Sequence, residues 1–243
     1  MIFLRNSNTT LQANCYILAD DTQRVALVID PGAKSAPWVE ASLKKHELSL
    51  GAVLLTHGHS DHCWDAPVIV GEDVPVYVSA PDLYRLDDPA HYTAFSASPF
   101  ERESGHVWER PARVEEIPPS LFVGGGAELV PGVALRAIPM PGHTEGSTIF
   151  LFGGTITPDE ETPQLPDTVS GQYLLTGDVL FAGSIGRTDL PGGDDREMVQ
   201  SLRTLSQIIA PDTAFFPGHG HPSTVAIEAE INPYLRHACA SDI

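Results

Sequence analysis

Short runs of apolar residues recur along the chain, and polar turns separate them. The runs at 13–19 and 25–29 are rich in β-branched residues and flank a polar turn, so they predict a β-hairpin. The run at 51–56 predicts another strand, which stops at His57. The same pattern predicts further strands at 134–138, 147–152, 173–175 and 214–216. Four of these strands lead through a turn to a His or Asp, and strand ends are where α/β proteins commonly place catalytic residues.

Three segments between or after these strands have helical patterns. The first is predicted at about 36–46, with Pro37 tolerated in its first turn. The second spans about 194–209, with an Asp as its N-cap and apolar residues at helical spacing. The third covers about 224–238 and is expected to be interrupted or kinked near Pro233. This mixture of strands and helices indicates an α/β domain.

No linker of low complexity divides the chain, so we expect residues 1–243 to form a single domain. Two less regular stretches are expected to be insertions. The first, at about 82–130, is rich in Pro and contains a run of three glycines; it is either a surface loop or a lid over the substrate. The second, at 153–172, is acidic and rich in Pro and is expected to extend a hairpin. We expect no additional C-terminal domain.

Composition and charge exclude several classes of function. The 243 residues include 14 Lys and Arg against 32 Asp and Glu, which gives a formal charge of -18. So acidic a chain lacks the clustered cations that bind nucleic acid or anionic lipid. The sequence contains no run of about 18 apolar residues, as a membrane span requires, and no apolar run typical of a secretory signal. Three widely separated cysteines argue against a disulfide scaffold, and together these features predict a cytoplasmic protein.

The sharpest chemical signal is the sequence HGHSDH at 57–62, which follows directly on a predicted strand. It offers four metal ligands of the imidazole and carboxylate types, which suit Zn, Fe or Mn. In an extended segment His57 and His59 project to the same side, because side chains alternate with a period of two. A turn at Ser60 would bring Asp61 and His62 to a second point in space. The motif therefore predicts two neighbouring metal sites.

Further ligands are expected from the ends of other strands. The candidates are His143, Asp178 and His219, each of which directly follows a Gly. Glycine permits a close approach of the backbone or a positive φ. Each residue alone is a weak candidate, since Asp178 could cap the next segment and His219 could belong to an ordinary loop. Their shared position after a strand makes them candidates together.

With these motifs in order, the chain resembles the metallo-β-lactamase superfamily over nearly its whole length. The resemblance rests on HGHSDH at 57–62, PGHTEGS around His143, TGDVLFAGSIGRTDL from 176 and FFPGHG around His219. Within that superfamily the chain is most similar to hydrolases of the glyoxalase II (hydroxyacylglutathione hydrolase) type. The resemblance implies an αβ/βα sandwich, a four-layer α/β fold with two facing mixed sheets and outer helices. The metal site would lie at one edge of the sandwich.

The resemblance also implies how the ligands are shared. One metal would be held by His57, His59 and His143. A second would be held by Asp61, His62 and His219, with Asp178 bridging the two. The implied cofactors are two divalent ions, with Zn the expected metal and Fe or Mn as alternatives. The catalytic residues would be Asp61, which orients the attacking hydroxide, and Asp178.

The implied reaction is hydrolysis of a thioester, such as a hydroxyacylglutathione, by a hydroxide that bridges two metals. Asp30 matches a position near the site in this family and is expected to support it, although it could equally serve a turn. Arg187 could bind a substrate carboxylate or pair with Asp189. Cys63 is expected to be a small buried residue rather than a ligand. The only partner we expect is a small-molecule substrate, and the sequence does not predict an oligomeric state.

Two alternatives remain open from the sequence. An enzyme resembling persulfide dioxygenases of the same fold would hold one Fe(II) with His57, His143 and Asp178. A non-enzymatic scaffold that holds metal would not need all seven ligands, and all seven are present. The hydrolase is favoured because the second set of ligands is intact.

Overall fold

Six strands form the first sheet, which mixes antiparallel and parallel pairs. The computed structural model describes residues 1–7, 10–166 and 171–240. The first three strands pair antiparallel and the last three add in parallel. In their order across the sheet, the strands are β1 (Ile2–Ser7), β2 (Asn14–Ala19), β3 (Val25–Ile29), β4 (Ser49–Leu54), β5 (Val76–Val78) and β6 (Val114–Glu116).

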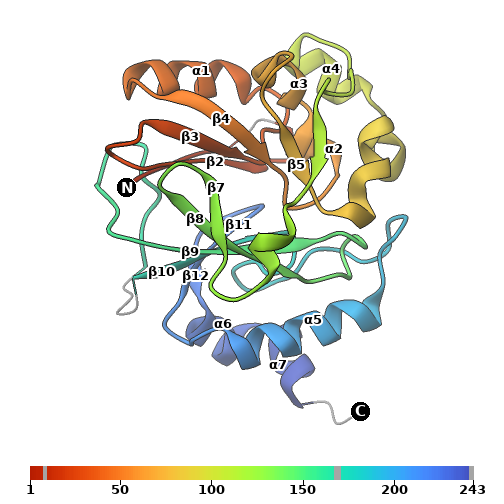
Figure 1. Ribbon diagram of the computed structural model, residues 1–243. Helices are drawn as coiled ribbons and strands as arrows, with labels where there is room; N and C mark the ends of the chain where they lie inside the picture. The colour runs from red at the N-terminus through yellow and green to blue at the C-terminus, as the bar shows by residue number, and fades with distance from the viewer. Residues whose placement is uncertain (8–9, 167–170, 241–243) are drawn as a thin grey trace.

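A second sheet of six strands faces the first (Figure 1). Its strands pair antiparallel except for β10 and β11, which run parallel. In their order across the sheet, they are β12 (Ser223–Thr224), β11 (Ala214–Pro217), β10 (Gln172–Gly177), β9 (Thr148–Gly153), β8 (Val133–Pro139) and β7 (Ala127–Val130). The parallel pair β10 and β11 is important for the site, because both strands end at the same edge.

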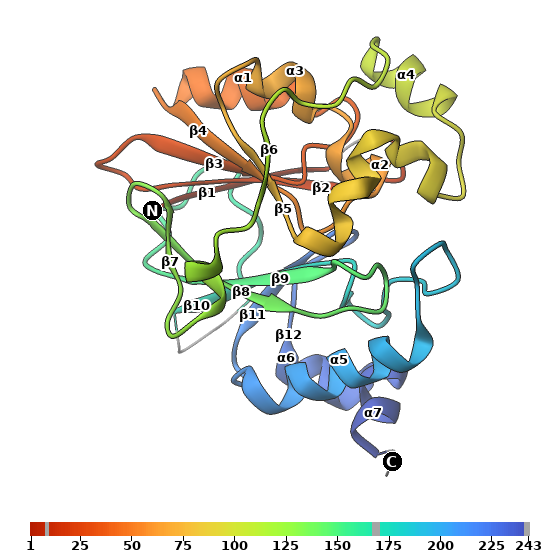
Figure 2. The same ribbon diagram turned by 45° about the vertical axis from the view of Figure 1, so that its right-hand side comes forward.

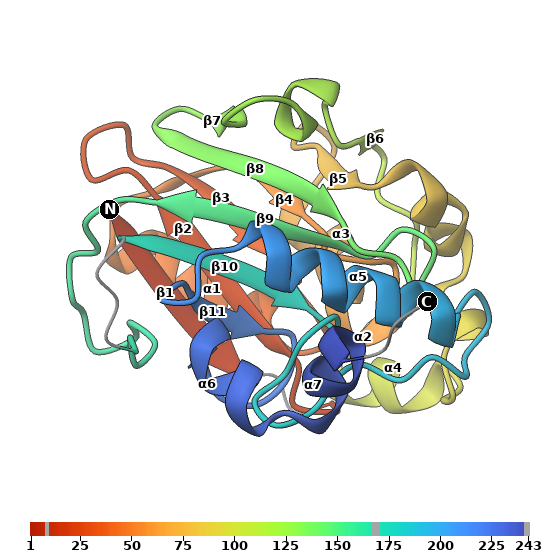
Figure 3. The ribbon, with the colours of Figure 1, turned by 90° about the horizontal axis from the view of Figure 1, so that it is seen from below.

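Helices cover the outer face of each sheet (Figure 2). The first sheet packs against α1 (Ala36–Lys45) and α3 (Ala66–Val70). The second packs against α5 (Asp195–Ile208), α6 (Val225–Ile231) and α7 (Pro233–Ala240), which lie in front of it when the molecule is seen from below (Figure 3). The four layers confirm the predicted metallo-β-lactamase sandwich.

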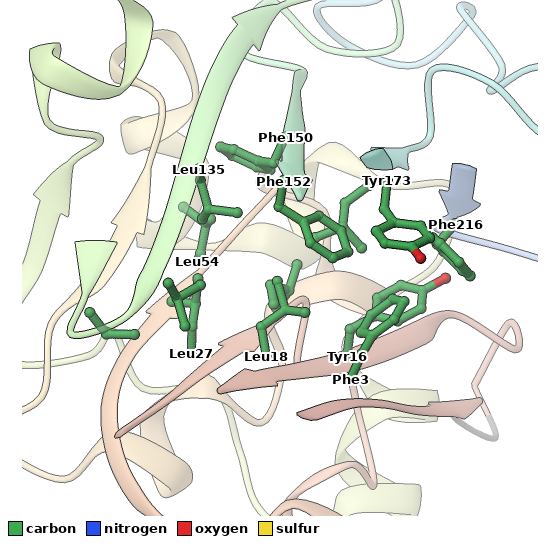
Figure 4. Close-up of a cluster of buried hydrophobic side chains, with 14 of the residues drawn as sticks. Phe3, Tyr16, Leu18, Leu27, Leu54, Leu135, Phe150, Phe152, Tyr173 and Phe216 are labelled. Carbon is green, nitrogen blue, oxygen red and sulfur yellow. The ribbon is translucent and has the colours of Figure 1, made fainter. Parts of the chain in front are cut away.

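The core between the sheets is aromatic and aliphatic (Figure 4). Phe3 from β1 packs edge-on against Phe216 from β11, with ring centroids 4.7 Å apart. Alternation along β2 explains the layering, since Tyr16 and Leu18 face the other sheet while Ile17 faces the helices. Each large side chain buried in this way contributes roughly 1.5–3 kcal/mol. The two sheets are therefore held as one rigid support for the loops at their edges.

The shorter elements lie in the connections and mostly near one edge of the sandwich. They are α2 (Ser60–Cys63), α4 (Ser98–Ser104) and the 3-10 helices η1 (Ala80–Asp87), η2 (Pro89–Tyr92) and η3 (Pro119–Phe122). None of the helices in the described part of the chain combines the length and hydropathy that crossing a bilayer requires. The three cysteines are free thiols.

The three predicted helices agree with the structure, but five strands among the described residues were not predicted, namely β1, β5, β6, β7 and β12. Asp194 caps α5 by accepting hydrogen bonds from the backbone N–H groups of Arg196 and Glu197. The C-terminal helix breaks at Asn232, immediately before Pro233, to give α6 and α7. The longest of the five unpredicted strands is β1, whose polar second half gives no strand pattern by itself. It is ordered by antiparallel pairing with β2 along its whole length.

The two stretches predicted as insertions differ in structure. The first, at 82–130, contains helical turns together with β6 and β7, which form edge strands of the two sheets. The second, at 153–172, connects the antiparallel strands β9 and β10, as a hairpin extension would. Positions 167–170 of this connection lie outside the described residues.

Candidate metal centre

All seven predicted ligands come together at one edge of the sandwich. They lie beyond the ends of strands β4, β8, β10 and β11, in the order expected from the sequence. Six of the seven are buried, and His219 is the most accessible, with a side chain 23% exposed. Strands in both sheets thus set the positions of the seven side chains. These are His57, His59, Asp61, His62, His143, Asp178 and His219.

The segment 57–62 changes from extended chain to helix at His59. This residue has extended backbone angles, φ -80° and ψ 150°, and is the N-cap residue of α2. The helical turn that follows carries Asp61 and His62 round to a different point from His57. The predicted turn at Ser60 is therefore present, and it places the side chains of one short motif in two clusters.

The seven side chains form overlapping groups of three. In each group the donor atoms lie within 4.8 Å of one another. His59 Nδ1 lies 2.9 Å from His143 Nε2 in the first group, and His219 Nε2 lies 3.3 Å from Asp61 Oδ2 in another. The groups are His57–His59–His143, His57–His62–Asp178 and Asp61–His62–His219.

Asp178 lies between the two outer groups, His57–His59–His143 and Asp61–His62–His219. Its Oδ2 is 3.5 Å from His143 Nε2 and 3.4 Å from His219 Nε2. Its Oδ1 is 3.4 Å from His62 Nε2. A single carboxylate that reaches donors of both groups has the position of a bridging ligand.

Gly218 lets the backbone pass close to this carboxylate. A Cβ at position 218 would collide with Asp178 Oδ1 and would come within 2.8 Å of His62 Cε1. The chain after β11 therefore approaches the centre at a distance that only glycine permits. This packing sets where His219 enters the site.

Four of the five histidines engage Nδ1 outside the centre and turn Nε2 toward it. His143 Nδ1 donates to the Arg187 carbonyl at 2.6 Å, and His219 Nδ1 donates to the Leu11 carbonyl at 3.0 Å. His57 Nδ1 lies 3.0 Å from Thr56 Oγ1. His62 Nδ1 lies 3.0 Å from Asp30 Oδ2. Partners of this kind orient metal-binding imidazoles and leave the other nitrogen free for the metal.

Asp30 is held in place by its other contacts. It accepts hydrogen bonds from Thr56 N at 2.8 Å and from Thr56 Oγ1 at 2.7 Å. It is buried, and its φ of 51° is in the left-handed region. The contacts fit the predicted supporting role, because Asp30 touches His62 while staying outside the groups of donors.

Two of the histidines are held neutral. Burial lowers the pKa of His57 well below its usual value, and the imidazoles of His62 and His143 lower it further. Burial, together with the His143 imidazole, lowers the pKa of His59 to about 3. Neutral imidazole is the form that binds metals. These two residues therefore carry free lone pairs at neutral pH.

The second cluster, which consists of Asp61, His62 and His219, holds protons tightly. Burial lowers the pKa of His62, but the carboxylates of Asp178 and Asp61 overcome this and raise it to about 9. The same balance raises the pKa of His219 to about 11. Burial raises the pKa of Asp61, and His62 and His219 more than reverse it, so that this pKa is lowered. Carboxylates and imidazoles here attract positive charge, whether from protons or from metal ions.

Several donor atoms have no hydrogen-bond partner among the described residues. His57 Nε2, His59 Nε2 and Asp178 Oδ1 are all buried in this condition. Leaving such atoms unpaired is costly, and divalent cations held by the groups of donors would satisfy His57 Nε2 and Asp178 Oδ1. Nitrogen and oxygen donors in these proportions suit Zn, Fe or Mn. The residues therefore fit a centre for two metal ions.

Comparison with known proteins gives the family. The model of the metallo-beta-lactamase superfamily matches residues 8–155, which include HGHSDH and His143. The chain belongs to the metallo-beta-lactamase superfamily. The resemblance found in the sequence is thus confirmed, and members of this superfamily are mostly hydrolases.

Relatives within the superfamily span this chain almost completely. An uncharacterized protein of Mycobacterium leprae is 34% identical over 93% of this chain and 94% of its own length. The hydroxyacylglutathione hydrolase GloC of Haemophilus influenzae is 26% identical, again over 93% of this chain and 94% of its own length. The relatives therefore include a glyoxalase II-type enzyme.

Solved structures of the superfamily agree with the fold. The BLEG-1 B3 metallo-beta-lactamase superposes with a TM-score of 0.71 and 26% identity, covering 96% of this chain and 99% of that one. A second protein, TTHA1623, was solved in a di-iron-bound form and superposes with a TM-score of 0.68 and 29% identity, covering 95% and 98% of the two chains. Metals other than zinc therefore occur among structures similar to this one.

Beside the superfamily's ligands lies a cavity of about 200 Å³. Its walls include Asp61, Asp178 and the apolar side chains of Leu11, Phe181 and Leu190. Residues 93–95 of the predicted first insertion also line it, so part of that segment adjoins the site. The cavity therefore reaches the carboxylate of Asp178.

Arg187 lines this cavity but is already paired. Its Nε and Nη2 donate to the Asp189 carboxylate at 2.6 and 2.8 Å, and both side chains are largely exposed. Its backbone carbonyl holds His143, as described above. Cys63 is fully buried in the layer between the first sheet and its helices, as expected.

Sequence reasoning missed two buried residues behind the centre. Asp82 and Arg85 are fully buried in η1 and contact the loops that carry the ligands. Their only signal in the sequence was a charged pair three residues apart in a segment rich in Pro. Such a pair is ordinarily exposed, so it did not stand out.

Proposed function

We propose that this chain is a metal-dependent hydrolase that acts on a thioester, such as a hydroxyacylglutathione. The observation that carries the proposal is the position of Asp178, whose two oxygens face donors of both outer groups at 3.4–3.5 Å. A bridging carboxylate of this kind is typical of centres with two metals. The similarity to hydroxyacylglutathione hydrolase GloC along almost the whole chain supports a thioester as substrate.

The grouping of the donor atoms supports the proposed ligand assignment. His57, His59 and His143 would hold one ion, Asp61, His62 and His219 would hold the other, and Asp178 would bridge them. Two divalent ions there would lower the pKa of a shared water from 15.7 toward about 7 and polarise the substrate carbonyl. Zn is the expected metal, and the di-iron-bound neighbour makes Fe the first alternative.

The chain's own residues position the reactants. Asp61 lines the cavity, and its Oδ2 lies 3.3 Å from His219 Nε2; it would accept a hydrogen bond from the attacking water and so orient it. Leu11, Phe181 and Leu190 wall the cavity and keep bulk water from the carbonyl. Asp178 keeps its charge, because the surrounding histidines overcome burial and hold its pKa well below the usual value.

No cysteine near the centre suits the role of nucleophile. Cys63 follows a ligand directly, but it is fully buried, and burial raises the pKa of its thiol well above the usual value. A thiol that is both protonated and inaccessible attacks nothing. Metal ions held by the seven ligands would instead supply the nucleophile, by activating a water.

Arg187 is the cation placed to receive a carboxylate of the substrate. Its partner Asp189 is exposed, and an exposed ion pair is worth only ~0–1 kcal/mol. A substrate carboxylate can therefore displace Asp189 at little cost. This role places the polar end of the substrate at the mouth of the cavity, near Phe95.

Metal analysis combined with two assays tests the proposal. The protein is purified without added metal, and S-lactoylglutathione hydrolysis and persulfide-dependent O₂ uptake are measured on one preparation. Two metal ions per chain with thioester hydrolysis are expected. One Fe per chain with O₂ uptake would show a dioxygenase instead. Bound metal with neither activity would favour a different substrate or the non-enzymatic scaffold.

A further inference from the structure

Asp82 joins the two loops that carry the first group of ligands, although it belongs to neither. It lies on η1 and is fully buried. Its Oδ2 accepts hydrogen bonds from Gly58 N at 2.8 Å and from Thr144 Oγ1 at 2.8 Å. We propose that Asp82 is a positioning residue that fixes the loop 57–62 relative to His143 and so sets the geometry of the first metal site.

The donors to Asp82 stand next to the ligands themselves. Gly58 lies between His57 and His59, and Thr144 directly follows His143. The two residues that donate to this one carboxylate oxygen are therefore sequence neighbours of all three members of the first group. A shift of this oxygen would move all three imidazoles relative to one another, and metal centres tolerate little displacement of their ligands.

The other carboxylate oxygen tightens the same junction. Asp82 Oδ1 accepts from Gly146 N at 2.9 Å. A Cβ on Gly146 would come within 2.6 Å of Asp82, and a Cβ on Gly58 would come within 2.8 Å of the Arg85 side chain. Both loops thus approach η1 where they have no side chain, which allows their N–H groups to reach the carboxylate directly.

Arg85 balances the buried charge and extends the junction to a third loop. Its Nε donates to Asp82 Oδ1 at 3.1 Å. Its Nη2 donates to the Pro191 carbonyl at 2.8 Å and also pairs with Glu145. A buried carboxylate needs such a partner, because an unpaired one would be strongly destabilising. Pro191 follows Leu190, which lines the substrate cavity, so the junction also reaches the wall of the active site.

This inference rests on the proposed metal centre, but its test uses metal alone and no substrate. The variant is Asp82→Asn, which keeps the size of the side chain but turns an acceptor into a donor against N–H and O–H groups. We expect its affinity for Zn²⁺, measured by competition with a chromophoric chelator, to fall roughly 10–100-fold. The Co²⁺-loaded variant should also show a changed visible absorption spectrum, which reports the geometry of the ligands.

Asp65→Asn is the matched control. Asp65 is equally buried and also accepts a backbone hydrogen bond, from Ala36 N at 2.8 Å, but it bonds neither loop of the first group. It should lower thermal stability and leave the Zn²⁺ affinity and the Co²⁺ spectrum unchanged. A purely structural role for Asp82 would make the two variants behave alike.

If Asp82→Asn does not fold, Thr144→Val replaces it, since this change removes only the hydroxyl contacts of Thr144. It should shift the Co²⁺ spectrum and weaken Zn²⁺ binding in the same direction. A folded variant with wild-type affinity and spectrum would overturn the inference, and so would a wild-type protein that binds neither Zn²⁺ nor Co²⁺. A wild-type protein that binds both metals but hydrolyses no thioester would overturn the proposed function and leave the role of Asp82 intact.

Discussion

His62 is held by Asp30 through the ring nitrogen that faces away from the metal centre. Its Nδ1 lies 3.0 Å from Asp30 Oδ2, and both side chains are buried. The contact fixes the rotation of the imidazole and directs Nε2 toward Asp178 and Asp61. The carboxylate also makes the imidazole a stronger ligand. The geometry of the second cluster therefore depends on a residue 32 positions earlier in the chain.

Replacing Asp30 with Asn should weaken metal binding. Asn tolerates the left-handed backbone that Asp30 adopts, so the change removes charge without adding backbone strain. We expect affinity for the second metal to fall roughly 10–100-fold, as is typical when such a partner of a ligand is lost. Stepwise Zn²⁺ titration against a chelator measures this. Equal affinities in the variant and the wild type would show that Asp30 serves only the turn.

Gly218→Ala should damage the centre more than the fold. The added methyl group would collide with Asp178 and approach His62, so these ligands must move apart. We expect loss of bound metal and of hydrolysis, with the circular dichroism spectrum retained. Gly125→Ala is the control, since its new methyl group would meet nothing within 4 Å and it should behave as the wild type. Full metal content in Gly218→Ala would contradict this description of the site.

The metal-free protein should become less stable as the pH rises. The folded state raises the pKa of His62 to about 9 and that of His219 to about 11, from an ordinary value of 6.5. Groups with a raised pKa stabilise the fold fully below pH 6.5, and the stabilisation is lost as the pH rises through the folded values. Thermal melts of EDTA-treated protein at pH 6.5 and 9 should therefore show a lower Tm at pH 9.

Two variants identify the source of this dependence on pH. His62→Gln should weaken it, because one of the two proton-binding groups is gone. His221→Gln, at an exposed position, should leave it unchanged. A Tm that rises with pH in the metal-free wild type would mean that the second cluster does not hold protons in this way. Metal should reverse the trend, because binding requires deprotonated imidazoles.

Local patterns predicted much of this protein. HGHSDH is contiguous, and the other ligands each follow a strand that is visible as an apolar run, so His143, Asp178 and His219 could be placed without a structure. The predicted strands were visible because alternate residues face two different cores, as Tyr16 and Ile17 do in β2. Features that depend on a single segment of the chain could therefore be predicted well from the sequence.

Contacts between distant segments were not predictable in the same way. β1 is a strand because β2 pairs with it, and its polar second half gives no such pattern alone. Asp82 lies 24 residues from Gly58 and 62 residues from Thr144, so its two bonds form only when three loops meet. Similarly, Arg187 could be identified as a candidate cation, but its pairing with Asp189 and the bond from His143 to its carbonyl required the structure.

The dependence of activity on metal stoichiometry tests the account most directly. Metal-free protein is titrated with Zn²⁺, and hydrolysis of S-lactoylglutathione is followed after each addition, in the wild type and in Asp61→Asn. The wild type should need a second equivalent of metal for full activity, because the proposed reaction uses a water that two ions would activate together. Asp61→Asn, which lacks a ligand of the group Asp61–His62–His219, should bind the first equivalent and stay nearly inactive. Full activity with one equivalent, or an Asp61→Asn variant as active as the wild type, would contradict the two-metal hydrolase.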